Sequence, residues 1–157
     1  MCYYPYIHGI VYIPPENYKY ASIDALSGIE NQFQNFRKKY QYFCLHSDFN
    51  SRTSKEPDFI DFERESGSDE NVEHLFIDTS NIYMLEELDI PLRRANEDKV
   101  INQYVRKFLD FCKYNDVFIL IGRIGEDRDI GKCTCKHVGV VDYSIVSPEY
   151  LKHIANF

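Results

Sequence analysis

The chain has 157 residues, 44% hydrophobic and 27% charged, which is typical of one globular domain with a substantial core. No apolar run approaches the roughly 18 residues of a membrane span, and the N-terminus has no signal-peptide pattern. Five cysteines, an odd number, are typical of reduced thiols, so we expect an intracellular protein. The formal net charge of −7 argues against strong non-specific binding of nucleic acid.

The first third of the chain predicts a strand, a helix and a second strand. Residues 7–13 are rich in β-branched and aromatic side chains and end at Pro14-Pro15. From Ser22 to Tyr40, apolar residues recur every three or four positions, as in an amphipathic helix. A second apolar strand then runs towards Asp48. Because a helix connects them, the two strands are expected to be parallel.

Residues 51–72 are polar, acidic and without a periodic pattern, and they predict a flexible loop within the single domain. A short helix is expected over residues 80–88 and a longer one over 98–114. The continuous apolar run 117–121 predicts a buried central strand, and residues 133–135 and 138–146 predict two more. Ser147-Pro148-Glu149 then has the residue types that open a helix. The fold class is therefore α+β.

Asp48 and Asn50 are the first candidate site residues, because they stand where the second strand runs into a polar turn. Two residues apart in extended backbone, they share a face. A carboxylate beside an amide could hold a metal or an attacking water and contact a phosphate. An Asx turn that closes the strand is the structural alternative.

Asp142 is the second candidate, because it is a carboxylate within the apolar run 138–146. Such a group must be paired or must lie at the open end of its strand. It could be satisfied by backbone donors, or it could orient a catalytic histidine.

Two further groups of residues could supply metal ligands. His46 precedes Asp48 by two residues and could touch a metal on the same face, or make an ordinary hydrogen bond. Cys133, Cys135 and His137 alternate, but a zinc site needs four ligands and no second Cys/His pair stands nearby in the sequence.

The order of these motifs resembles the endonuclease/exonuclease/phosphatase superfamily, and most closely the endonuclease domains of invertebrate non-LTR retrotransposons. The motifs are a strand ending at Tyr12 before Pro14-Pro15, then Asp48-Phe49-Asn50, then the strand around Asp142. The resemblance implies part of a four-layer α/β/β/α sandwich and Mg²⁺-dependent hydrolysis of phosphodiesters, with DNA as the partner of the intact domain. A phosphomonoesterase of the same superfamily is the alternative.

By that resemblance, Tyr12 would hydrogen-bond the scissile phosphate, Asp48 and Asn50 would position the attacking water, and Asp142 would hold the catalytic histidine. Asp48 is also the expected metal ligand. The family's metal-binding glutamate would stand before residue 12 and its catalytic histidine after residue 157. We therefore expect an interior fragment of the domain with impaired turnover, or an inactive remnant that serves as an interaction module. The sequence leaves the oligomeric state open.

Overall fold

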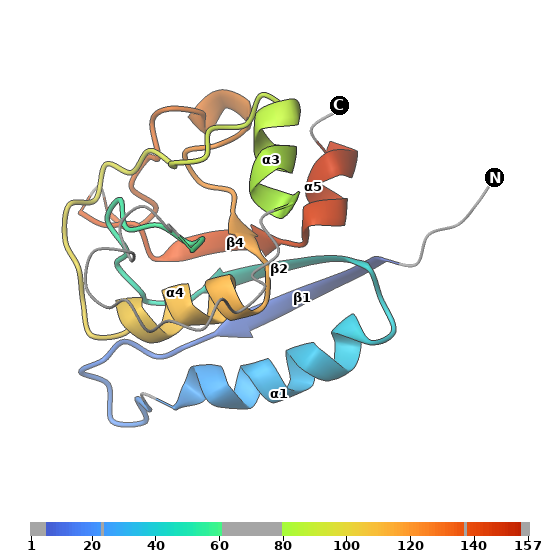
Figure 1. The fold of residues 1–157 in the computed structure, drawn as a ribbon. Coiled ribbons are helices and arrows are strands. Elements are labelled where there is room, and N and C mark those ends of the chain that lie inside the picture. Colours follow the sequence, from blue (N-terminus) through green and yellow to red (C-terminus); the bar gives the residue numbers. More distant parts are fainter. Residues whose placement is uncertain (1–5, 23, 61–79, 137, 155–157) are drawn as a thin grey trace, which may run out of the picture.

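The computed structural model describes residues 6–22, 24–60, 80–136 and 138–154. Its first unit is β1 (Tyr6–Tyr12), α1 (Ala25–Arg37) and β2 (Tyr42–Asp48), and the two strands are parallel, which confirms the predicted β-α-β arrangement (Figure 1). The strand β1 stops before Pro14, because two prolines in succession remove two backbone donors.

Two later strands complete a mixed four-stranded sheet with the order β1-β2-β4-β3. The strand β4 (Asp142–Val146) pairs antiparallel with β2 on one side and with β3 (Phe118–Ile119) on the other. The run 117–121 was predicted to be a central strand, but β3 is short and lies at an edge of this sheet. The centre is formed by β2 and β4, which therefore position the residues on them most rigidly.

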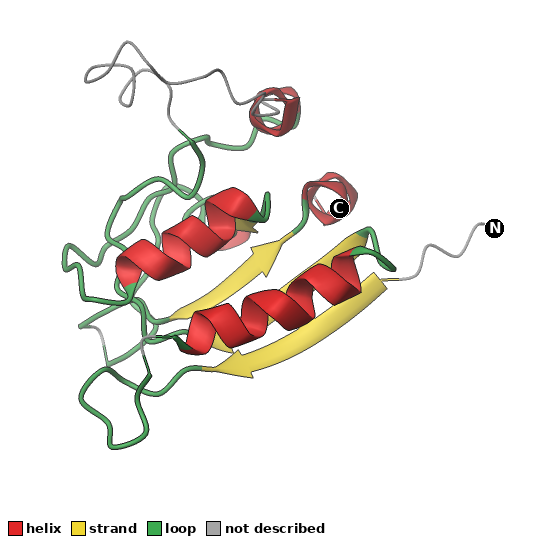
Figure 2. Ribbon diagram, turned by 60° about the horizontal axis from the view of Figure 1, so that its bottom comes forward, coloured by secondary structure: helices red, strands yellow, loops and turns green. Residues whose placement is uncertain are grey.

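Helices cover the two faces of the sheet unequally. Both α1 and α4 (Val105–Tyr114) lie on one face, as Figure 2 shows, and their aromatic side chains form a core with Phe43 and Tyr143. On the other face, α3 (Ser80–Glu87) and α5 (Pro148–Ile154) pack against the part of the sheet around Cys44 and Val146. The rest of that second face carries exposed or half-buried residues, and we call it the open face: Ile10, Tyr12, His46, Asp48, Asp142 and Ser144.

The expected α+β class is confirmed, but the four-layer sandwich is not. Within the described ranges the open face is not covered by a second sheet, and helices rather than strands pack beside it. In the same ranges, no helix has the length and apolar character needed to cross a membrane.

The loops depart most from the sequence-based expectations. Residues 51–60 belong to the predicted flexible loop, yet Ser51, Thr53, Asp58 and Phe59 are buried. The remainder of that loop, from residue 61 to 72, lies outside the described residues. The helix expected from residue 98 begins at Val105, and the strand expected over 133–135 is a single bridge between Cys135 and Gly139. In these segments polar side chains form hydrogen bonds with the loop backbone, in place of the regular backbone hydrogen bonds of a helix or strand.

Candidate functional site

Three of the four predicted site residues lie in one row across the end of the sheet. Tyr12 is paired in register with Asp48, and Asp48 is paired with Asp142 on its other side. Residues directly opposite each other on neighbouring strands project from the same face, with Cβ atoms about 4.5–5.5 Å apart in an antiparallel pair. Residues that are far apart in the sequence therefore form the row Tyr12–Asp48–Asp142, as we call it below.

The row forms part of an open cleft of about 660 Å³ on the open face. Its walls come from β1, β2, β4 and the segment that follows β3. The polar residues lining it are Tyr12, His46, Ser47, Asp48, Asp127, Asp142, Tyr143 and Ser144, of which Ser47 and Tyr143 point their side chains to the opposite face. Among the described residues that line the cleft there is no Lys or Arg. The cleft is thus acidic with apolar walls. It favours a cation, and an anion could bind there only after a cation had neutralised the carboxylates.

The charge on Asp48 is disfavoured in this setting. Partial burial raises the pKa of Asp48, and so does the negative charge of Asp142. The backbone N–H of Asn50, which donates to Asp48 Oδ1 at 3.1 Å, lowers the pKa, but the net shift is upward. Asp142 is exposed at the first position of β4, so the sequence-based alternative of a carboxylate at the open end of a strand is the correct one. A divalent cation between the two carboxylates would relieve their repulsion.

Asn50 has a different role from the other three residues. Its φ of 47° lies in the left-handed region, where Asn is tolerated, and its Nδ2 donates to the carbonyl oxygen of Ile13 at 2.8 Å. It does not line the cleft. The side-chain amide therefore ties the ends of β1 and β2 together. The backbone N–H of Asn50 donates to Asp48 Oδ1, which is the Asx turn named above as the structural alternative.

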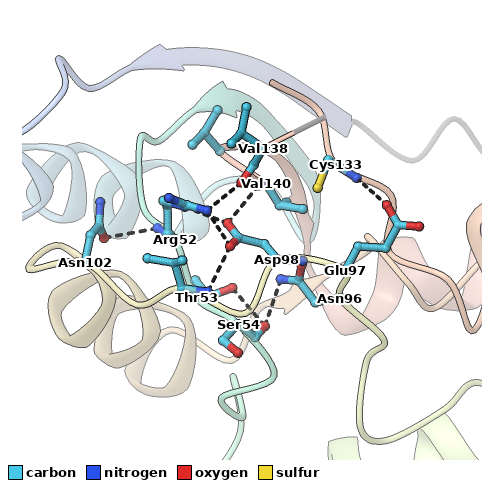
Figure 3. A network of polar contacts seen from close by, with 12 residues as sticks. Arg52, Thr53, Ser54, Asn96, Glu97, Asp98, Asn102, Cys133, Val138 and Val140 are labelled. Atoms are coloured by element: carbon cyan, nitrogen blue, oxygen red, sulfur yellow. Dashed lines mark hydrogen bonds and ion pairs between the residues drawn. The ribbon is translucent and has the colours of Figure 1, made fainter. Parts of the chain in front are cut away.

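A polar network fixes the loop that follows β2 and the segments around it (Figure 3). Arg52 donates to both carboxylate oxygens of Asp98, at 2.8 and 2.6 Å, and Asp98 also accepts from the backbone N–H of Val140 at 3.0 Å. Asn102 donates to the carbonyl oxygen of Asn50 at 2.7 Å. These contacts anchor the chain on both sides of the row, just after Asp48 and just before Asp142.

The sequence did not single out Ser144 and Asp127 as parts of the cleft. Ser144 stands two residues after Asp142 in the same strand, so alternation could have placed it on the same face. Asp127 accepts from the backbone N–H groups of Gly122 and Lys132, both at 2.9 Å, and so stabilises its own loop. No sequence signal distinguishes that role from a ligand role.

Asp48 and Asp142 are suitable ligands for Mg²⁺ or Mn²⁺. Mg²⁺ is commonly bound by one or two carboxylates, several waters and substrate phosphate oxygens, rather than by a full protein cage. The donor set of the row fits this pattern. Within the described residues, no histidine is hydrogen-bonded to Asp142, and the histidine in the cleft is His46, whose Nδ1 lies 2.8 Å from Ser144 Oγ.

Comparisons with protein-family models, with curated proteins and with solved structures find no match. Function is therefore inferred from the geometry of the row and from the motif order in the sequence.

Proposed function

We propose that this chain carries the metal- and phosphate-binding part of a phosphodiester-hydrolysing site of the endonuclease/exonuclease/phosphatase type, with DNA as its substrate class. The proposal is supported by one observation above all. Tyr12, Asp48 and Asp142, selected from motif order, are neighbours in the register of three strands and line one cleft.

Each member of the row has a distinct part in the proposed chemistry. Asp48 and Asp142 would hold the cation, which would neutralise charge and activate a water. Tyr12, with 63% of its surface exposed at the edge of the row, would donate a hydrogen bond from its hydroxyl to a non-bridging phosphate oxygen. Asn50 keeps the backbone after Asp48 in place through Ile13.

A small phosphomonoester is the second candidate substrate. Neither Lys nor Arg is present among the described residues of the cleft, whereas a duplex-binding surface neutralises several phosphates with such side chains. A single phosphate on a cation held by Asp48 and Asp142 would need no extended basic surface.

Hydrolysis assays separate these possibilities. The purified chain is incubated with supercoiled plasmid or with p-nitrophenyl phosphate, in Mg²⁺, Mn²⁺ or EDTA. Metal-dependent nicking that falls by on the order of 100-fold or more in Asp48→Asn, and persists in Glu86→Gln on the exposed side of α3, supports a nuclease. Turnover of the monoester without nicking identifies the second candidate. Failure to turn over either substrate, by a chain shown to be folded, contradicts an active hydrolase.

A further inference from the structure

The sheet surface that carries the row holds a second group of potential ligands, nearer to α5. His8 on β1 is paired in register with Cys44 on β2, and His46 stands two residues after Cys44. Alternate residues of a strand share a face, so all three side chains project to the same side of the sheet. Their ligand atoms, one from each residue, all lie within 4.8 Å of one another.

The geometry of this His8–Cys44–His46 cluster is close to that of a zinc site. Zn–S bonds of about 2.3 Å and Zn–N bonds of about 2.0–2.1 Å in a tetrahedron place the ligand atoms roughly 3.4–3.6 Å apart. Cys44 Sγ and His46 Nε2 are already 3.3 Å apart. The rings of His8 and His46 are stacked, with centroids 5.6 Å apart and an interplanar angle of 28°. A shift of about one ångström in exposed histidine rings would complete the arrangement.

We propose that His8, Cys44 and His46 form a binding site for a borderline-soft divalent cation, Zn²⁺ in particular, with three protein ligands and an open fourth position. Three ligands and an exchangeable water are the pattern of reactive rather than purely structural zinc sites. Imidazole and thiolate ligands favour Zn²⁺ over Mg²⁺, so this site differs in metal preference from the oxygen ligands of the row.

Neighbouring side chains hold both histidine rings. Ser144 Oγ lies 2.8 Å from Nδ1 of His46, which leaves Nε2 of that ring directed at Cys44. The hydroxyl of Tyr150 lies 3.1 Å from Nε2 of His8. Partners of this kind orient the ring nitrogens of metal-ligating histidines and are part of most such sites.

The thiol of Cys44 must lose its proton when the metal binds. On binding, the S–H bond breaks, the Sγ–metal bond forms, and the proton passes to solvent. The affinity for the metal should therefore fall as the pH is lowered.

This inference does not depend on the proposed hydrolase function, because it uses other residues and another class of metal. A spectroscopic titration of the full chain with Co²⁺, followed by displacement with Zn²⁺, tests it. For this titration the chain is prepared with the substitutions Cys133→Ser and Cys135→Ser, which remove the more accessible of the described thiols. We expect a thiolate-to-cobalt charge-transfer band that saturates at one Co²⁺ per chain, and loss of that band when Zn²⁺ is added.

Single substitutions in the same background identify the ligands. Cys44→Ala should abolish the charge-transfer band, and His8→Gln and His46→Gln should each weaken Co²⁺ binding by on the order of 10-fold or more. His153→Gln in α5 and Asp48→Asn in the row should leave the band unchanged. His8 is exposed, so its variant tests the site even if Cys44→Ala fails to fold. A folded chain without the band, or a band that survives Cys44→Ala, would overturn the proposal.

Discussion

Asp48 and Asp142 lie directly opposite each other in the antiparallel register of β2 and β4, where each strand meets the cleft. Two carboxylates in this position repel each other, and the charge of Asp142 contributes to the raised pKa of Asp48. The arrangement therefore costs stability at neutral pH in the absence of a cation.

The first prediction concerns Asp48→Asn in metal-free buffer. A carboxyl group whose pKa is raised in the folded state loses its stabilising contribution as the pH rises from the ordinary value of 3.8 through the folded value. The asparagine variant should therefore have a higher free energy of unfolding than the wild type at neutral pH, and the advantage should disappear below pH 3.8. Urea denaturation in EDTA at several pH values measures this. If Asp48→Asn were less stable than the wild type at neutral pH, the surroundings of Asp48 would stabilise its carboxylate and the expectation would be wrong.

The second prediction concerns the buried ion pair between Asp58 and Arg123, whose side chains are fully buried and 2.6 Å apart. Burial raises the pKa of Asp58, but the charge and hydrogen bonds of Arg123 outweigh it and lower the pKa overall. Asp58→Asn leaves Arg123 without its counter-charge and should cost about 3–5 kcal/mol of unfolding free energy. Chemical denaturation gives the value.

The matched control for that pair is the exposed one between Asp89 and Arg128, 3.1 Å apart. Asp89→Asn should leave the denaturation midpoint almost unchanged, because solvent screens an exposed pair. Similar losses of unfolding free energy in Asp58→Asn and Asp89→Asn would show that burial does not decide how much an ion pair contributes to stability.

The third prediction contrasts two glycines. Gly122 begins the turn that supports the cleft wall after β3; its φ is +73°, and a Cβ atom there would lie 2.0 Å from the carbonyl oxygen of Ala95. Gly122→Ala should destabilise the protein by more than about 1 kcal/mol. Gly28 lies in α1 with nothing within 4 Å of an added Cβ, so Gly28→Ala should stabilise by about 0.5–1 kcal/mol. Thermal denaturation of both variants should give shifts of opposite sign, and shifts of the same sign would contradict this account.

The fourth prediction concerns acid stability through Asp98. Its pKa is raised by burial and lowered by the hydrogen bond from Arg52 and by two backbone N–H groups, and the net shift is downward. Asp98 therefore stabilises the fold above its ordinary pKa of 3.8, and this contribution is lost as the pH falls through the folded value. Asp98→Asn should cost about 1–3 kcal/mol at neutral pH and flatten the decline in acid.

Asp24→Asn, which removes the exposed partner of Lys107, is the control for Asp98→Asn. It should preserve the wild-type decline of stability in acid. If the stability of Asp98→Asn fell in acid as steeply as that of the wild type, Asp98 would not be the source of the acid sensitivity.

Local patterns in the sequence predicted the first half of the sheet. Alternating and helical periods indicated β1, α1 and β2, and the helix between the strands required them to be parallel. With the strand ends known, Tyr12 and Asp48 could be expected at one edge. The position of Asp142 beside them depends on antiparallel pairing between β2 and β4, which local patterns do not encode.

Long-range polar contacts explain most of what the sequence did not predict. Asp98 was expected in a helix, but its carboxylate binds Arg52 and the backbone of Val140, so the helix begins later. Asp58, in a stretch of loop composition, is buried because Arg123 meets it from a distant part of the chain. His8 and Cys44 form one cluster through strand register, which becomes visible when the pairing is known.

Both candidate reactions need a cation at the row, so Mn²⁺ binding there is the decisive measurement. Electron paramagnetic resonance of free Mn²⁺ measures binding to the wild type, Asp48→Asn, Asp142→Asn and the Glu86→Gln control. The account predicts one Mn²⁺ per chain, binding at least about 10-fold weaker in either row variant, and no change in Glu86→Gln. Binding that is equal in all four folded proteins, or absent from the wild type, would contradict a cation site at Asp48 and Asp142.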